Sequence, residues 1–214
     1  MPELTSRPRA PRQVRGDRDA RERLLAAGER LFGQRPFDSV SIDDISDEAG
    51  VAHGLLFHYF QSKRGFLLAV TRRAASRVEA MHLSLPPQET SEAAFRAFLK
   101  AHMDSVLSRR AAFVAQSRGS VGVDAAVRVI WEEARGRAIH LFYGYLGIRN
   151  APPKLYVLLR AWLGFFDELL LSWVERSDLS HAEVIDTSIA NLRTALSNYS
   201  LLDPGCRLEM IRPL

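Results

Sequence analysis

Residues 41–63 contain two short helix-forming stretches joined by a tight turn, and they constrain the fold more than any other part of the chain. Ser41 followed three residues later by Asp44 predicts a capped helix start, and Gly50 supplies the left-handed residue that ends a helix. The following stretch, 52–57, is long enough for a second short helix and too short to fold alone. We therefore predict a helix-turn-helix, whose second helix enters the major groove of DNA.

The same segment resembles the DNA-binding segment of the TetR family of bacterial repressors. The resemblance rests on Ser41-Ile-Asp-Asp-Ile, Ala49-Gly50-Val51, Gly54-Leu-Leu-Phe-His-Tyr-Phe60 and Ser62-Lys63. The spacing from Ala49 through Lys63 matches without gaps, and with the preceding helix the resemblance covers about the first third of the chain. Two positions depart from the family pattern. Ala52 stands where a Ser or Thr cap is usual, and Phe57 stands where a phosphate-contacting Tyr is common.

We predict that DNA is contacted by the start of the second helix and by the helix that follows it. His53 lies where such helices reach base edges. Lys63 follows the expected cap Ser62, so its ammonium and the free N–H groups of that helix start can face one phosphate. The resemblance implies a phosphate contact for Tyr59, whereas Leu56 and Phe60 are expected in the core. The predicted DNA-binding set is Ser41, Ala52, His53, Gly54, Leu55, His58, Tyr59 and Lys63.

The composition of this 214-residue chain fits a folded cytoplasmic protein. Cys206 is the single cysteine, so no internal disulfide forms, and without clustered Cys and His a structural zinc site is not expected. No apolar run approaches the roughly 20 residues that span a bilayer. The N-terminus is polar and rich in arginine, which is not the pattern of a secretory signal.

Most of the net charge of +4 lies in the first 18 residues, which hold a net +3. This segment contains Arg7, Arg9, Arg12, Arg15 and Arg18 against Glu3 and Asp17. Its prolines favour an extended chain over a helix. Two interpretations stay open: a solvated arm, or an arm that follows DNA phosphates or enters a minor groove, where negative potential favours arginine.

The rest of the chain predicts an all-α fold, because apolar residues recur at helical spacing and no strand-like alternation is present. We expect a first helix over 17–33, a Pro-containing linker over 83–90, a break at 117–120 and helices over 124–146 and from 153 to about 176. Ser180 and Glu183 predict a capped last helix. The predicted domains are a basic disordered arm (1–16), the helix-turn-helix domain (17–64), a helical effector-binding and dimerisation domain (65–205) and a tail (206–214).

The helix that ends near residue 176 is apolar on more than one face, so it must bury both. It is either the central core helix of a monomer or part of a seam between two subunits. The resemblance implies a homodimer formed through the last two long helices. The predicted interface residues are Phe165, Leu169, Trp173, Ile185, Ile189, Leu192 and Leu196.

The resemblance also implies a helical cavity that holds a small-molecule effector. The candidate lining residues are Phe98, His102, Phe113, Trp131, Phe142, Tyr143, Trp162 and Phe166, and ordinary core packing is the alternative for each. Their aromatic content favours an apolar or aromatic effector. His102, His140 and Asp167 could supply polar contacts.

No catalytic or cofactor-binding motif is present in the sequence. The adjacent carboxylates at 43–44 and 132–133 point in different directions on a helix, and nucleophile-elbow, phosphate-loop and nucleotide-binding patterns are absent. We therefore expect a cytoplasmic, all-α, homodimeric repressor without a cofactor, which binds double-stranded DNA at a palindromic operator and responds to a ligand. Two alternatives remain: a protein of this fold that activates or organises DNA without an effector, and a helical interaction protein that has lost DNA binding.

Overall fold

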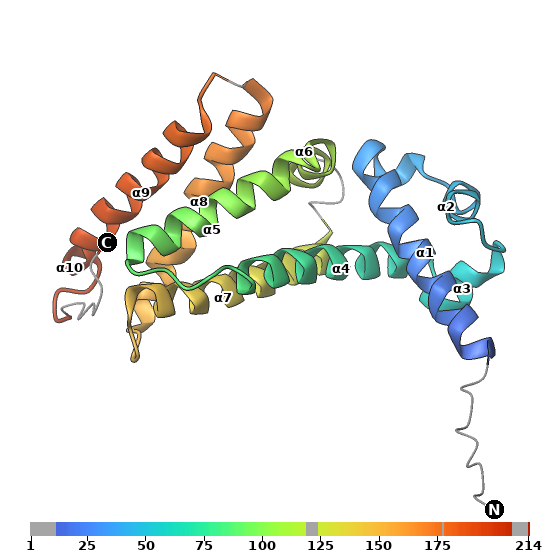
Figure 1. Ribbon diagram of the computed structural model, residues 1–214, viewed down its shortest axis with the longest axis horizontal. Helices are drawn as coiled ribbons and strands as arrows, with labels where there is room; N and C mark the ends of the chain where they lie inside the picture. The colour runs from blue at the N-terminus through green and yellow to red at the C-terminus, as the bar shows by residue number, and fades with distance from the viewer. Residues whose placement is uncertain (1–11, 119–123, 177, 207–213) are drawn as a thin grey trace, which may run out of the picture. The chain divides into compact units, whose positions relative to one another are not determined.

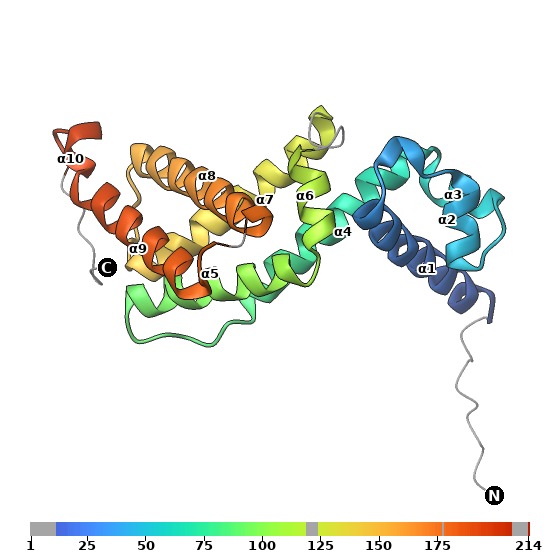
Figure 2. The same cartoon turned by 90° about the horizontal axis from the view of Figure 1, so that it is seen from above.

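The computed structural model describes residues 12–118, 124–176, 178–206 and 214, and this part of the chain is helical without strands (Figures 1 and 2). The all-α prediction is thus confirmed. The chain divides between Thr71 and Arg72 into two compact units, a few residues beyond the predicted boundary at 64. The division falls inside helix α4 (Lys63–Leu83), which contributes its first part to one unit and its second part to the other.

The first unit contains α1 (Arg12–Gln34), a 3-10 turn η1 (Phe37–Ser39), α2 (Ile42–Ala49), α3 (Gly54–Phe60) and the start of α4. Helix α1 begins five residues before the predicted start, so the expectation of disorder over 12–16 is wrong. The segment 12–16 includes Arg12, Gln13 and Arg15, which are good helix formers. It begins directly after Pro11 and has no proline of its own. The rest of the predicted arm, 1–11, lies outside the described residues.

Local signals set the ends of α2. The Ser41 hydroxyl accepts a hydrogen bond from the Asp44 N–H (2.9 Å), and the Asp44 carboxylate accepts one from the Ser41 N–H (2.8 Å). Gly50 ends the helix with φ +61°, a conformation that a Cβ disfavours. These predicted caps are confirmed. They place α2 and α3 over a core of Leu24, Val40, Ile45, Leu56, Phe60 and Phe66.

The second unit contains the second part of α4, then α5 (Ser91–Leu107), α6 (Arg110–Arg118), α7 (Ala125–Leu146), α8 (Pro153–Arg176), α9 (His181–Ser197) and the short α10 (Tyr199–Leu202). Thr90, Asp124 and Ser180 cap α5, α7 and α9. Helix α9 packs against α8 and α5, while α7 packs against α8 and α5. The predicted break at 117–120 falls partly outside the described residues, and the sequence did not predict the break after Leu107.

The core of this unit corrects the predicted subunit interface. Ile189, Leu192 and Leu196 on α9 are 2%, 0% and 5% exposed, and Trp173 on α8 is also buried, all in one large apolar cluster. These four side chains pack against other residues of the same protomer, so assigning them to the subunit interface is wrong. Helical periodicity shows that a face is buried but not which surface covers it. The other three predicted residues are half-buried at the edge of the cluster: Phe165, Leu169 and Ile185.

Within the described residues, no helix combines the length and the apolar character needed to cross a bilayer.

Candidate functional site

Helix α3 divides its side chains between the core and the outside. Leu56 and Phe60 are buried, as predicted, while His53, Gly54, Phe57 and His58 are exposed and Leu55 is half-buried. Phe57 is 44% exposed, an unusual position for a phenylalanine ring. A Cβ added at Gly54 would meet no atom within 4 Å, so the protein's own packing does not require glycine there.

His53 is fixed by a contact with α2. It occupies the cap position of α3, and its side chain makes no capping hydrogen bond. Instead its Nδ1 lies 2.6 Å from Oδ1 of Asp43. This contact leaves Nε2 as the ring nitrogen directed away from Asp43. Ala52 is exposed and precedes the cap residue His53, so α3 starts two residues later than predicted. The helix has no side-chain cap. This agrees with the departure of Ala52 from the Ser or Thr cap that is usual in the family.

The residues around the predicted phosphate contacts differ in their burial and in the hydrogen bonds that they already make within the protein. The Ser62 hydroxyl accepts a hydrogen bond from the Gly65 N–H (2.9 Å), which confirms Ser62 as a cap of α4. Tyr59 is half-buried against the core of the first unit. The Lys63 ammonium donates to the Phe37 carbonyl (2.7 Å) and lies 4.3 Å from the centroid of the Phe37 ring. Lys63 therefore holds the η1 turn, a role that the sequence did not predict.

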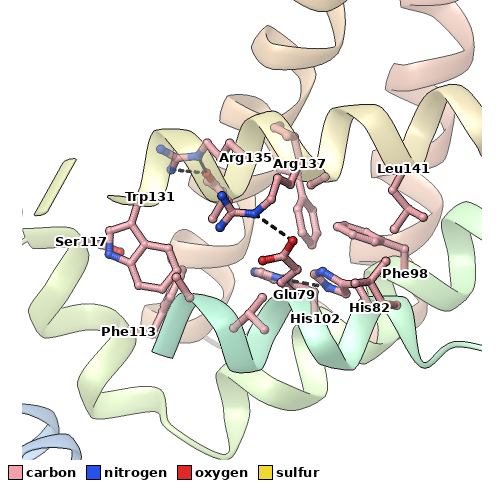
Figure 3. Close-up of a pocket in the computed structure, with 18 residues that line it drawn as sticks. Glu79, His82, Phe98, His102, Phe113, Ser117, Trp131, Arg135, Arg137 and Leu141 are labelled. Carbon is pink, nitrogen blue, oxygen red and sulfur yellow. Dashed lines mark hydrogen bonds and ion pairs between the residues drawn. The ribbon is translucent and has the colours of Figure 1, made fainter. Parts of the chain in front are cut away.

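A cavity of about 170 Å³ lies inside the second unit, between α4, α5, α6, α7 and α8 (Figure 3). Five predicted residues line it: Phe98, His102, Phe113, Trp131 and Phe166. The other three do not. Phe142 and Trp162 are buried in the packed core, and Tyr143 lies half-buried elsewhere. Aromatic composition could not separate rings that fill a core from rings that border a gap.

The charged wall of the cavity was mostly missed. Arg137 pairs with Glu79 of α4 at 2.8 Å, and Arg135 donates to Asp167 of α8 at 2.6 and 3.1 Å. Burial disfavours the Arg135 charge, but the carboxylates of Asp167 and Glu132 outweigh it, so the pKa of Arg135 is raised. Glu79 lies on α4 and lines the cavity, although the sequence analysis did not include it among the candidate residues. Asp167 was predicted as a polar contact and does line the cavity.

Two histidines form the polar end of the cavity. The His82 ring stacks on Phe98 with a centroid distance of 3.9 Å, and its Nε2 lies 3.4 Å from Nδ1 of His102. Burial, with the nearby His102, lowers the pKa of His82 to about 3. Burial also lowers the pKa of His102, against the opposing effect of Asp167. His82 continues the spacing of Val70, Ala74 and Val78, a signal that could have placed it facing inward. His140 is exposed, and Nδ1 of its ring lies 2.7 Å from the Gly136 carbonyl, outside the cavity.

Comparison with known proteins identifies the family. Residues 24–70 match the sequence profile described as bacterial regulatory proteins, tetR family, and residues 91–194 match the profile described as tetracyclin repressor-like, C-terminal domain. The chain belongs to the TetR family. TetR-family proteins are transcriptional regulators that bind DNA through a helix-turn-helix, and they are not enzymes.

Sequence similarity to individual TetR-family members covers about a third of the chain. The regulator EthR of Mycobacterium tuberculosis strain H37Rv is 35% identical over 75 residues, which is 35% of this chain and 35% of EthR. The repressor NemR of Escherichia coli K12 is 40% identical over 57 residues, 27% of this chain and 29% of NemR. The chain thus matches about a third of the length of these relatives. A tetR-family regulator from Streptomyces coelicolor shares the fold over 87% of this chain and 84% of its own (TM-score 0.77, 23% identity).

Proposed function

We propose that the protein is a cytoplasmic repressor that binds an inverted-repeat operator as a homodimer and leaves it when a small molecule occupies the cavity. The observation that carries the DNA-binding part is the exposed face of α3, from which His53, Gly54 and His58 are accessible while Leu56 and Phe60 anchor the helix. The name of the E. coli relative NemR, a transcriptional repressor, supports repression as the direction of control.

In this proposal the base contacts come from the first turn of α3. Asp43 holds Nδ1 of His53, so Nε2 is directed at a base edge in the major groove. The open space at Gly54 lets the DNA backbone come close to the helix. Leu55 and the exposed ring of Phe57 offer apolar contact to thymine methyl groups.

The phosphate contacts surround this turn. The exposed Ser41 oxygen accepts the cap bond, so its own O–H remains to donate to a phosphate. Tyr59 and the start of α4 supply further donors. Lys63 has three ammonium hydrogens, and the Phe37 carbonyl takes one of them. The arginines of residues 1–11 extend the positive surface in sequence, and we propose that they add phosphate or minor-groove contacts.

We place the dimer interface on the outer face of α8 and α9. Val157, Ala161, Gly164 and Glu168 recur at helical spacing on α8 and are all exposed, as are Thr187, Ala190 and Thr194 on α9. A Cβ at Gly164 would meet nothing within 4 Å, so its small size serves no contact inside the protomer. Small residues allow a second copy to approach closely, while half-buried Phe165 and Leu169 provide apolar area beside them. This face replaces the buried residues that the sequence indicated.

A fluorescence-anisotropy titration with DNA from upstream of the protein's own coding region tests the proposal. We expect specific binding that weakens as salt rises, and His53→Ala to reduce affinity for that DNA more than for random DNA. His140→Ala is the matched control, since His140 is an exposed histidine of the second unit. Deleting residues 2–11 should lower affinity and flatten the salt dependence with the fold intact. Equal binding to specific and random DNA would contradict the proposal.

A further inference from the structure

The charged groups of the cavity are already paired within the chain (Figure 3). Glu79 with Arg137, and Asp167 with Arg135, give two positive and two negative groups along the lining. A second carboxylate, Glu132, also lies 3.0 Å from Arg135. A charged ligand would therefore enter a partly buried site without a free counter-ion, or would displace one of these pairs. Both routes are unfavourable. We therefore expect the cavity to bind uncharged ligands more tightly than charged ones.

The histidine end of the cavity is uncharged as well. His82 and His102 are both shifted toward the neutral imidazole, and they share a contact of 3.4 Å. In a neutral pair linked in this way, the two remaining ring nitrogens are one donor and one acceptor. This end can therefore meet a polar ligand atom of either kind, and it offers no charge to an ion.

The opposite end contains a hydrogen-bond donor that no described residue satisfies. The indole N–H of Trp131 is buried and has no acceptor among the described residues, although Trp131 lines the cavity. The other two tryptophans donate to carbonyls, Trp162 to Ser188 at 3.0 Å and Trp173 to Leu179 at 2.6 Å. A buried donor without an acceptor is costly and uncommon. An acceptor on a ligand would satisfy it.

The remaining wall is aromatic and the space is small. The rings of Phe98, Phe113 and Phe166 line it together with aliphatic side chains. Its volume of about 170 Å³ is close to the roughly 150 Å³ of an engineered cavity that holds benzene. This space fits one aromatic ring with a short substituent.

We propose that the cavity binds a small uncharged molecule with a single aromatic ring and one hydrogen-bond acceptor, such as an aryl ketone or aldehyde, whose oxygen accepts from the Trp131 N–H. This inference rests on the proposed function only in taking the cavity as the effector site, and ligand binding itself needs no DNA.

Calorimetric titration of the full chain with matched probes tests the ligand class. Acetophenone should bind about fivefold more tightly than ethylbenzene, which lacks the acceptor, consistent with one hydrogen bond. Benzoate and benzylammonium should bind at least about tenfold more weakly than acetophenone, because they carry charge. The three-ring ketone 9-acetylanthracene should not compete. Tighter binding of either ion, tighter binding of the large ketone, or no binding of any probe would overturn the proposal.

The role of the indole N–H has its own test. Trp131→Phe keeps an aromatic ring and removes the donor, so acetophenone should lose its advantage over ethylbenzene. Trp173→Phe is the control and should retain that advantage, with circular dichroism reporting folding of both. NMR of the unmodified protein gives an independent check, since acetophenone and not ethylbenzene should move one indole N–H signal to lower field. An unchanged acetophenone advantage in folded Trp131→Phe, or unmoved indole signals, would refute the assigned contact.

Release of DNA is measured separately, in an anisotropy assay with each probe. If acetophenone binds and DNA stays bound, the ligand class holds and the effector part of the proposed function fails. If benzoate releases DNA and acetophenone does not, effector control stands and the assigned ligand class is wrong.

Discussion

The surface around α3 and the cavity of the second unit are assembled in different ways. The surface is built from one continuous segment, 41–63, whose caps and turn lie within a few residues of each other. The cavity draws its lining from five helices, between Ala75 and Asp167. The surface therefore depends on local geometry that each short signal specifies. The cavity depends on how long helices pack, so a change in one helix moves walls contributed by the others.

The largest contrast is expected between a core position and an outer position of the second unit. Leu192→Glu should remove several kcal/mol of stability and unfold the protein, because Leu192 is 0% exposed. Gly164→Arg should fold normally and become monomeric, because the space at Gly164 is open. Circular dichroism and light scattering together measure both outcomes. A folded Leu192→Glu monomer would restore the original interface assignment.

Acid should destabilise the cavity region more than the DNA-binding surface. His82 stays unprotonated when folded, with a pKa of about 3, whereas the unfolded chain takes up this proton below about 6.5. The unfolded state binds more protons in that window, so the free energy of unfolding falls as pH falls. We expect a loss of about 2 kcal/mol between pH 7 and pH 5. Denaturant unfolding of His82→Phe should show a smaller loss, and an equal loss would contradict this assignment.

The contact of Lys63 on α4 with the η1 turn makes the stability of the DNA-binding unit depend on one side chain. The expected effect is smaller than that of protonating His82. Lys63→Ala removes the bond to the Phe37 carbonyl and the contact with its ring, and should lower the free energy of unfolding by about 1–2 kcal/mol. It should also reduce the slope of log affinity against log salt by about one unit. Lys100→Ala is the control for loss of a lysine charge outside the DNA-binding unit, because Lys100 is an exposed lysine of α5 whose partner is Asp104 on the same helix. Unchanged stability of Lys63→Ala would show that the contact between Lys63 and Phe37 contributes nothing to the free energy of unfolding.

The smallest effect compares two glycines with open space, one in each unit. Gly54→Ala and Gly164→Ala should each raise stability by up to about 1 kcal/mol, because alanine favours the helix. Only Gly54→Ala should weaken DNA binding, by about the factor of five that the loss of one or two contacts implies. Thermal melts and anisotropy titrations measure the two effects. Equal DNA affinity of both variants would show that no backbone approaches Gly54.

Local chemistry explains what the sequence could predict. Ser41 with Asp44, Gly50, Asp124, and Ser180 with Glu183 act on groups a few residues away, so each marked a helix end that the structure contains. Leu56 and Phe60, four residues apart on α3, were also expected in the core and are buried there.

The rest depended on contacts between distant residues. Trp162 and Phe166 have similar side chains on one helix, yet one fills the core and the other also borders the cavity. Periodicity gave α9 an apolar face without showing that the chain itself covers Leu192. The contact of Lys63 with Phe37 forms only when the η1 turn is folded. No sequence pattern in either segment predicts this contact.

Hydroxyl-radical footprinting on the upstream DNA tests the central claim most directly. A two-fold dimer presents two α3 helices, so the account predicts two protected half-sites related by an inverted repeat, with centres about one helical turn or a multiple apart. Gly164→Arg should lose the paired footprint, and Gly164→Ala should keep it. A single protected half-site, or an unchanged paired footprint from a Gly164→Arg protein that light scattering finds monomeric, would contradict the account.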